Sequence, residues 1–373
     1  MPDEGWAALL TPEGGILRRP DDVERAFARL WESAQGQHAG SGEHVTATRV
    51  CVANLIVVAS EEGFNAVNDV LGDLSPHYPT RTLVVLLDSA GRTQDITAGA
   101  GGGVRASVSA LCHVPQPGQP QVCCEQVVLG TAADDGRDLD RTLLPLLEAD
   151  VPTMAWWLPD PGRWPELWRC VAARADRLIV DSGPAGLRHL TPGDHAAVRE
   201  LGWYRTSQWR EVLAGMFDGS PREIWGRIES LEVAAGGDRV EDRIDAIWVA
   251  AFVAGQLGWQ AVKALGTGEH AFRADDREVR VRLTLGGKRL GLQAVVFGGG
   301  GTRYEVRSND EAPSEFRVLI HDERVCHLPR CIELPQPSWA QSLAAALTGR
   351  VVDAAFMRAA PLAERLATEW RGE

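Results

Sequence analysis

The chain has 373 residues, of which 45% are hydrophobic and 24% charged, and its formal net charge is −13. That length is enough for two domains of roughly 100–200 residues each. An excess of negative charge repels the phosphates of nucleic acids and of anionic lipids. We therefore expect neither a nucleic acid nor a membrane among the partners of this protein.

The amino terminus and the cysteines favour a cytoplasmic location. The first six residues, MPDEGW, are acidic and lack the basic and apolar regions of a signal peptide. No run approaches the roughly 18 apolar residues that are needed to cross a bilayer. The seven cysteines are odd in number and scattered over predicted strands and helices. This pattern favours reduced thiols over a framework of disulfides.

The first 190 residues predict an N-terminal extension followed by an α/β domain. Residues 1–44 contain a short amphipathic helix at 21–31 and a polar, glycine-bearing linker. Apolar runs at 49–59 and 82–88 predict buried strands, with a helix between them at 62–74. The segments 104–114 and 121–129 flank a proline-rich turn and predict a hairpin. Helices at 138–148 and 164–175 alternate with strands at 152–158 and 176–182, so we expect a mixed, largely parallel sheet flanked by helices over 45–190.

Residues 191–373 predict a second domain of the α+β class. Helical patterns cover 194–217, 221–231 and 240–265. Five strands then follow at short spacing, at 278–285, 289–297, 304–308, 315–321 and 325–334, and the run of four glycines at 298–301 predicts a tight turn between two of them. This spacing indicates an antiparallel meander, after which 338–370 returns to helix.

The sequence indicates no catalytic, cofactor or metal site. The glycine-rich run 99–103 precedes a predicted strand and not a helix, which favours a flexible loop over a phosphate-binding loop. No histidine stands with a serine or cysteine in the pattern of an activated nucleophile. No set of cysteines and histidines has the spacing of a zinc site. We expect a protein that is not an enzyme.

Two pairs of cysteines lie close together in the sequence. Cys123 and Cys124 are adjacent in a predicted strand, so their side chains should point to opposite faces and serve in packing. Cys326 and Cys331 lie five residues apart at a predicted strand end. They are a redox pair, part of a weak metal site with the nearby histidines, or inert thiols.

Three polar residues define a candidate ligand pocket. Asp181 and Ser182 lie at the carboxyl end of a predicted strand, where α/β folds place ligands; alternatively they cap the next helix. Arg81 follows a rigid proline turn and precedes a buried strand, which suits an arginine that clamps an anion or a carboxylate.

The segment 203–210 is a candidate partner surface. It gathers Trp203, Arg205, Trp209 and Arg210 in a short helical stretch. Tryptophan and arginine dominate the binding energy of protein interfaces, where one such residue can contribute roughly 2 kcal/mol or more. We add a second group of candidate contact residues, which consists of Trp156 and Trp157 at a strand end together with Arg81.

Several segments resemble the OpcA family, the glucose-6-phosphate dehydrogenase assembly proteins. The residues that match the family's tryptophan and arginine signature are Asp194, Trp203, Arg205, Trp209, Arg210 and Asp218. Further matches, in family order, are the first strand at 49–57, the Tyr-Pro-Thr-Arg turn at 78–81, the strand at 124–129, the Leu-Pro and Trp-Trp segments within 143–157, the Asp-Arg…Asp-Ser strand at 176–182 and the Leu-Gly-Trp of 257–259. The resemblance departs from the family in Tyr78, where a histidine is typical, and in a longer gap between Asp194 and Trp203.

The resemblance implies a non-catalytic protein that binds glucose-6-phosphate dehydrogenase and promotes its active oligomer in the oxidative pentose phosphate pathway. Two hypotheses of other classes remain open. One is an enzyme or metabolite sensor that binds a sugar phosphate near Arg81 and Asp181. The other is a scaffold whose 13 tryptophans serve a homo-oligomer.

Overall fold

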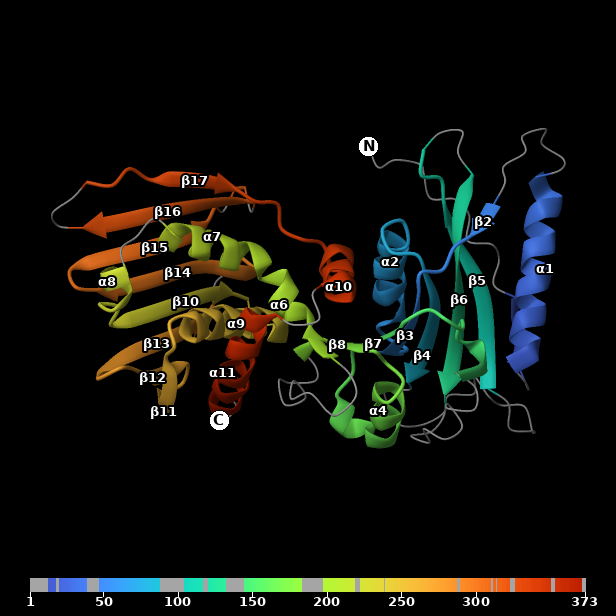
Figure 1. Cartoon of the computed structure of the whole chain (residues 1–373), viewed down its shortest axis with the longest axis horizontal. Helices are drawn as coiled ribbons and strands as arrows, with labels where there is room; N and C mark the ends of the chain where they lie inside the picture. The colour runs from blue at the N-terminus through green and yellow to red at the C-terminus, as the bar shows by residue number, and fades with distance from the viewer. Residues whose placement is uncertain are drawn as a thin grey trace. The chain divides into compact units, whose positions relative to one another are not determined.

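The computed structural model describes residues 13–17, 20–38, 47–87, 104–116, 120–131, 144–182, 197–218, 222–237, 239–286, 289–309, 311–312, 314–322, 326–349 and 353–370. The chain divides into two compact units (Figure 1). Unit 1 comprises Met1–Val180 and Pro192–Arg199, and unit 2 comprises Asp181–Thr191 and Glu200–Glu373. The sequence placed the division at residue 190, whereas the chain leaves unit 1 at Val180 and returns to it for 192–199.

Unit 1 is built on a nine-stranded sheet with the strand order β1-β5-β6-β4-β3-β7-β8-β9, in which β2 also pairs with β6. Its strands are β1 Glu13–Leu17, β2 Ala47–Arg49, β3 Ala53–Ser60, β4 Thr80–Leu87, β5 Val104–His113, β6 Gln121–Thr131, β7 Thr153–Trp157, β8 Arg177–Val180 and β9 Ala197–Glu200. The pairs β3–β4, β3–β7, β4–β6, β7–β8 and β2–β6 are parallel, whereas β1–β5 and β5–β6 are antiparallel. The predicted mixed, largely parallel sheet and the predicted hairpin are both confirmed.

Helices lie on both faces of this sheet. They are α1 Pro20–His38, α2 Phe64–Leu74 and α4 Pro165–Ala172, with single 3-10 turns η1 Leu144–Leu146 and η2 Pro161–Arg163. Glu125 and Gln126 are neighbours on β6, yet Glu125 bonds to Trp31 of α1 and Gln126 to Asn68 of α2, so α1 and α2 cover opposite faces (Figure 1). The N-terminal helix, expected in an appended extension, therefore belongs to the packing of unit 1.

Six strands of this sheet follow the strand order of a known fold; they are β3, β4, β6, β7, β8 and β9. Numbered along the chain, they stand in the sheet as 3-2-1-4-5-6, which is the doubly wound order of the Rossmann fold. In such folds ligands bind outside the carboxyl ends of the strands, at the switch point where successive connections leave in opposite directions. Here the switch point lies between β3 and β7, both fully or almost fully buried.

Unit 2 is built on an eight-stranded sheet with the order β11-β12-β13-β10-β14-β15-β16-β17. Its strands are β10 Ser230–Gly236, β11 Gln260–Gly266, β12 Glu269–Ala274, β13 Arg277–Leu285, β14 Gly291–Gly299, β15 Thr302–Ser308, β16 Glu315–Asp322 and β17 Arg330–Glu333. Neighbouring strands are antiparallel except β10 and β13, which are parallel. The predicted meander is confirmed, but β10, inserted between β13 and β14, was not predicted, and neither were β11 and β12.

The helices of unit 2 differ from the sequence-based expectation at their ends. They are α6 Leu201–Arg205, α7 Ser207–Asp218, α8 Arg222–Trp225, α9 Val240–Gln256, α10 Trp339–Thr348 and α11 Ala354–Trp370. Of the helix expected from 194, residues 194–196 lie outside the described residues, Ala197–Glu200 form β9, and α6 begins at Leu201. The helix expected over 221–231 is a single turn, followed by β10. The helix expected to reach 265 ends at Gln256, because Gly258 takes a positive φ of 70°, which stops a helix.

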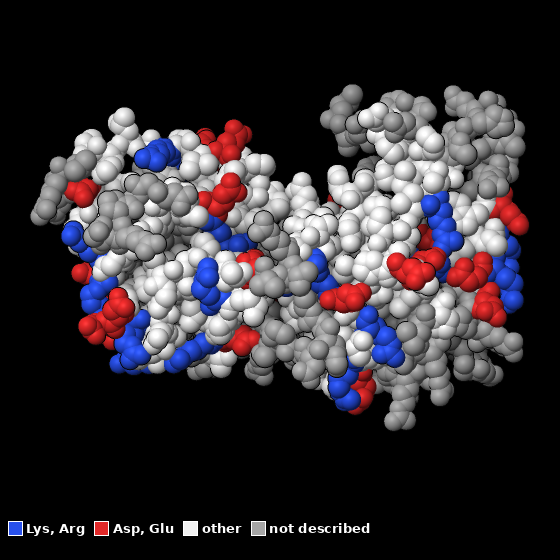
Figure 2. All heavy atoms as spheres, viewed as in Figure 1, with Lys and Arg blue, Asp and Glu red and all other residues white. Residues whose placement is uncertain are grey.

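Some predictions fall outside the described residues. The glycine-rich run 99–103 does, and so does most of the helix expected at 138–148, of which the described end forms only η1. The turn at 298–301 is confirmed, with positive φ values at Gly300 and Gly301. Among the described helices, none combines the length and the apolar character that a bilayer crossing requires. On the face that Figure 2 shows, acidic and basic side chains lie interspersed in both units.

Candidate functional site

The tryptophan and arginine segment forms α6 and the start of α7 in unit 2, and its aromatic rings are buried. Trp203 is 1% exposed and Trp209 is 3% exposed. Trp203 contacts Trp248 and Phe252 of α9 and Phe356 of α11, with ring centroids 5.5, 6.0 and 5.6 Å away. Its ring nitrogen donates a hydrogen bond of 2.9 Å to Asp353. The ring of Trp203 is thus the centre of an aromatic cluster inside unit 2.

Arg210 and Trp209 are also engaged within unit 2. The guanidinium of Arg210 lies 3.5 Å from the ring centroid of Trp203 and donates a 2.6 Å hydrogen bond to the Trp203 carbonyl. Burial lowers the pKa of Arg210 to about 10, although the carboxylate of Asp353 acts in the opposite direction. Trp209 packs edge-on against Phe316 of β16, with centroids 5.0 Å apart.

Arg205 lies between two carboxylates. Its Nη1 is 3.2 Å from Oδ2 of Asp181, and its Nη2 is 3.0 Å from Oδ1 of Asp245. The guanidinium also lies over the ring of Trp339, 4.8 Å from the centroid. Burial lowers the pKa of Arg205, but the carboxylates of Asp245 and Asp181 outweigh it, so the net shift is upward. Burial raises the pKa of Asp245 to about 6, against the opposing effect of Arg205.

Glu200 completes this cluster from the start of α6. Its side chain accepts hydrogen bonds from the backbone N–H groups of Ser182 (2.8 Å) and Trp203 (2.9 Å), and it therefore caps the helix. Glu200 is fully buried, and burial together with the charge of Asp181 raises its pKa to about 7. A Cβ at Gly202 would come within 2.8 Å of the Glu200 carboxylate, so this close approach requires a glycine.

Within this cluster the guanidinium of Arg205 is paired with Asp181 and Asp245, whereas Glu200 is bonded to backbone N–H groups. Three acidic groups surround one guanidinium, so at high pH the cluster contains more negative than positive charge.

Sequence analysis missed Glu200, Asp245 and Trp339. Glutamate is not among the usual N-cap residues, so the sequence held no clear signal for Glu200. The assignment of Trp203, Arg205, Trp209 and Arg210 to a partner surface stays a prediction. Their burial means that they would influence a partner through the packing of unit 2.

Arg81 is the centre of a second buried ion-pair cluster, in unit 1. Only 4% of its side chain is exposed, and its Nη1 lies 3.2 Å from Glu125 and 2.6 Å from Glu148. Its Nη2 pairs with Glu24 of α1. Burial raises the pKa of Glu125, although a 3.0 Å hydrogen bond from Trp31 and the nearby arginines oppose that shift. The carboxylates that a clamping arginine would bind are thus already supplied by the protein.

The two tryptophans at the end of β7 are core residues of unit 1. Trp156 is 1% exposed and Trp157 is fully buried. Trp157 packs edge-on against Trp168 of α4, with centroids 5.1 Å apart, and its ring nitrogen donates to the Pro159 carbonyl. Neither ring is available as a surface contact of unit 1, and their role in partner binding stays a prediction.

The candidate ligand pocket joins residues that belong to different compact units. Arg81 lies in unit 1, whereas Asp181 and Ser182 lie in unit 2. Asp181 pairs with Arg205, and the Ser182 N–H bonds to Glu200. A pocket formed by these three residues stays a prediction. Among the described residues, no group of three or more histidine, cysteine or acidic side chains could hold a metal ion.

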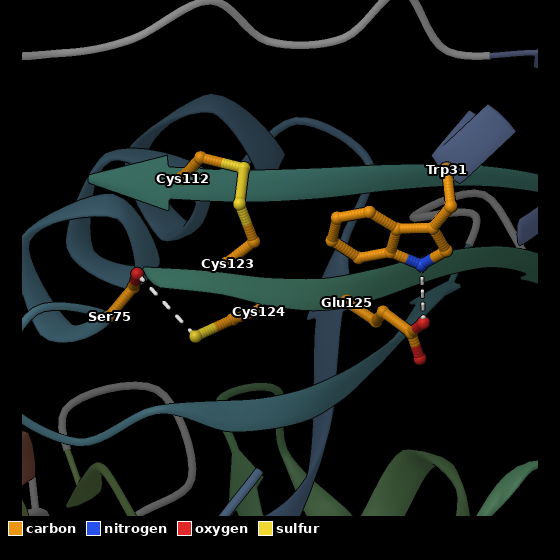
Figure 3. The surroundings of a disulfide bond; sticks show 6 residues. All are labelled: Trp31, Ser75, Cys112, Cys123, Cys124 and Glu125. Carbon is orange, nitrogen blue, oxygen red and sulfur yellow. Dashed lines mark hydrogen bonds between the residues drawn. A yellow bond between two sulfur atoms is a disulfide. The ribbon is translucent and has the colours of Figure 1, made fainter. Parts of the chain in front are cut away.

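The cysteines include one disulfide that the sequence did not lead us to expect (Figure 3). Cys112 of β5 and Cys123 of β6 stand opposite each other in the antiparallel pair and are bonded, so the expectation of seven reduced thiols is wrong for these two. Cys124 points to the other face, where it contacts the Ser75 hydroxyl at 3.8 Å, which confirms the alternation expected for the adjacent pair. Cys326 and Cys331 are exposed free thiols.

The first turn at the switch point of unit 1 is acidic. It connects β3 to α2 and carries Glu61 and Glu62, both exposed. The Gly63 N–H donates to the Ser60 carbonyl (3.1 Å), and the Phe64 N–H donates to the Glu61 carbonyl (3.2 Å). In dinucleotide-binding folds, glycines and free amides of this turn bind the pyrophosphate. Here the amides of Gly63 and Phe64 are used within the turn, which contains a single glycine beside two carboxylates.

The fold and these sites define a two-unit α/β protein with a doubly wound sheet, whose described turn between β3 and α2 carries two carboxylates. Two sequence models of one family match it in succession. The glucose-6-phosphate dehydrogenase subunit N-terminal domain matches residues 72–190, and the corresponding C-terminal domain matches residues 196–360. The chain belongs to the OpcA family.

Curated relatives carry the name OxPP cycle protein OpcA. The protein from Nostoc punctiforme is 28% identical over 272 residues, which are 68% of this chain and 52% of the relative. The one from Synechococcus elongatus is 27% identical over 210 residues, 52% of this chain and 46% of the relative. The chain thus spans about half the length of these relatives. Among solved structures, the 3-ketoreductase KijD10 from Actinomadura kijaniata has a TM-score of 0.49 at 14% identity, with coverage of 85% of this chain and 95% of that chain.

Proposed function

We propose that this protein is a non-catalytic partner of glucose-6-phosphate dehydrogenase that binds the enzyme and promotes its active oligomer in the oxidative pentose phosphate pathway. The family match supports the choice of partner, since both matching domains are described as parts of a glucose-6-phosphate dehydrogenase subunit. The names of the curated relatives refer to the same pathway.

The observation that carries the non-catalytic part of the proposal is the acidic turn between β3 and α2. A dehydrogenase of this fold would need that turn to bind the pyrophosphate of its nucleotide. Glu61 and Glu62 would repel a pyrophosphate, and the N–H groups of Gly63 and Phe64 are already bonded within the turn. We therefore expect the dehydrogenase, and not this chain, to bind the nucleotide.

Activation requires that this protein bind the active state of the dehydrogenase more tightly than the inactive state. A difference in binding free energy of about 1.4 kcal/mol shifts that equilibrium tenfold. Such an effect needs no chemistry from this chain. It needs only a contact surface that differs between the two states of the dehydrogenase.

The test uses the dehydrogenase of the same organism, assayed at limiting glucose 6-phosphate with increasing amounts of this protein. We expect a saturable rise in rate and co-elution of the two proteins as a larger complex in size-exclusion chromatography. An unchanged rate without co-elution would refute the proposal. A control reaction contains this protein, glucose 6-phosphate and NADP without the dehydrogenase, and NADPH formation in it would refute the non-catalytic assignment.

A thermal shift experiment tests the rival sugar-phosphate hypothesis. A ligand present at 100 times its dissociation constant adds about 2.7 kcal/mol of stability. We expect no rise in the unfolding temperature of this protein with glucose 6-phosphate, 6-phosphogluconate or NADP alone. A clear rise with either sugar phosphate would favour a metabolite sensor.

A further inference from the structure

The eight-stranded sheet of unit 2 has one face packed by helices. The rings of Trp209 and Phe217 on α7 contact Phe316 of β16 and Phe297 of β14, with centroids 5.0 and 5.1 Å apart. Figure 1 shows α7 and α9 lying across the same side of this sheet. Successive residues of a strand point to opposite faces. The residues that alternate with these aromatic side chains therefore project from the other face.

One line of residues on that other face carries cations and no carboxylate. Across β13, β10, β14, β15 and β16, the paired positions are Arg280, Ser230, Gly298, Arg303 and His321. We call these five residues the cationic row. Three strand spacings separate its two arginines, which is about 14 Å between their backbones. Only the small residues of β10 and β14 lie between them.

The positive charges of the two arginines in the cationic row are not fully neutralised by carboxylates of the protein. Arg280 is exposed, and among the described residues no carboxylate lies within ion-pair distance of its guanidinium. Arg303 keeps 51% of its side chain exposed, and its Nε lies 3.4 Å from Glu305. Glu305 also pairs closely with Arg307, so one carboxylate serves two guanidinium groups. Both arginines of the row can therefore accept a further anionic partner.

The surface between and beside these arginines is open. A Cβ at Gly298 would lie 2.8 Å from the Ser230 hydroxyl, so the middle of the row stays flat only with glycine there. At the end of the row, Arg303 and His321 line a cavity of about 820 Å³, together with Glu229, the turn 299–301 and His327. The cavity also contains Asp322, whose carboxylate accepts a 2.8 Å hydrogen bond from Thr302. A protruding side chain has room to enter beside the arginine.

We propose that the cationic row is a docking surface for an acidic segment of a partner protein. Acidic side chains of that segment pair with Arg280 and Arg303, while its backbone crosses the small residues between them. The identity of the partner as glucose-6-phosphate dehydrogenase rests on the function proposed above. Arginine is well suited to this contact, because its planar guanidinium binds a carboxylate through two parallel hydrogen bonds.

Electrostatics favours a different protein over a second copy of this chain as the occupant. A second copy would bring a net charge of −13 toward a molecule of the same charge. Because most of this chain is negatively charged, the row of cations is a local region of positive potential. It attracts an acidic segment and orients the partner protein as it approaches. Binding through the row should accordingly weaken as the salt concentration rises.

The test compares two double variants with the same change in charge. Arg280→Glu with Arg303→Glu reverses the row, and Arg358→Glu with Arg365→Glu reverses two exposed arginines of α11 in the same unit. Binding to the dehydrogenase is measured by titration calorimetry at low and at moderate salt. We expect the row variant to weaken binding at least about tenfold at low salt, and the α11 variant to stay within about threefold of the wild type. Circular dichroism and unfolding temperatures verify that both variants fold.

The outcomes separate this proposal from the function on which it rests. If the wild type fails to bind the dehydrogenase, the proposed function fails, and this assignment fails with it. If the wild type binds and both variants bind equally well, the cationic row is not the docking surface, although the function stands. If the row variant does not fold, the neutral pair Arg280→Gln with Arg303→Gln replaces it, and unchanged binding by that pair overturns the assignment. Loss of a self-associated species from the row variant alone, with dehydrogenase binding intact, identifies a second copy as the occupant and also overturns it.

Discussion

Replacing Glu200 by glutamine should change the pH dependence of the stability of this protein. Glu200 is fully buried, and burial and the charge of Asp181 raise its pKa from 4.5 to about 7. Between these two values the folded chain holds a proton that the unfolded chain has released. Stability from this group is therefore fully present below about pH 4.5, and it is lost as the pH rises through about 7.

The magnitude follows from the size of the shift. Each pH unit between the folded and unfolded pKa values corresponds to about 1.4 kcal/mol. For a pKa that rises from 4.5 to about 7, the free energy of unfolding should fall by about 2–3 kcal/mol between pH 5 and pH 8. Glutamine does not titrate, so Glu200→Gln should lack this part of the pH dependence. The variant should thus be weaker than the wild type at pH 5 by a larger margin than at pH 8.

The measurement is guanidinium unfolding followed by tryptophan fluorescence at pH 5, 6, 7 and 8. A matched control is Glu278→Gln, which changes an exposed glutamate of β13 in the same unit. We expect the control to follow the wild type at every pH, while the difference between the wild type and Glu200→Gln changes steadily. Parallel stability profiles for the wild type and Glu200→Gln would refute the reasoning that Glu200 is buried with a raised pKa.

Three further changes test the packing of the two units. Trp209→Ala should cost about 3–5 kcal/mol by the loss of a large buried ring, and an unchanged unfolding temperature would contradict the observed burial. Arg81→Met should cost about 1–3 kcal/mol, because it removes the buried guanidinium that pairs with Glu125 and Glu148, while Arg49 still lies 3.0 Å from Glu125; adding Glu125→Gln should restore part of the stability, and no recovery would argue against the Arg81–Glu125 pairing. Loss of the disulfide through Cys112→Ser, or by a reductant that reaches Cys123, should cost about 3 kcal/mol from loop closure. A wild-type stability that is insensitive to a strong reductant would show that the bond does not form in solution.

The aromatic segment shows where sequence reasoning about the site was limited. The sequence placed Trp203 and Trp209 correctly in helices and marked them as energetically important. It could not say whether the rings face a partner or the core, because both environments favour tryptophan. Their burial depends on Phe316 and Phe356, which lie more than 100 residues away along the chain. The cationic row was equally invisible, since its five residues come from five strands.

Local patterns in the sequence sufficed for most of the strands. The apolar runs of β3, β4 and β7 indicate strands buried on both faces, and this follows from the short-range periodicity of a pleated strand. The strand β11 was missed because it had been absorbed into the helix predicted over 240–265, and β10 because it was divided between the end of the helix predicted over 221–231 and the glycine break that follows it. Their conformation is set by pairing with β13, β14 and β12, which a local pattern does not contain.

The sequence by itself determined the family, the α/β class and the acidic character of the chain, because these depend on short motifs and on composition. Only the tertiary structure decided which distant groups meet. The antiparallel register of β5 and β6 brings Cys112 to Cys123, and the packing of α6 against α9 brings Arg205 to Asp245. Such contacts arise from the order of the strands and the packing of the helices, which join residues far apart in the chain. Short motifs do not contain that information, because each motif describes only residues that are neighbours along the chain.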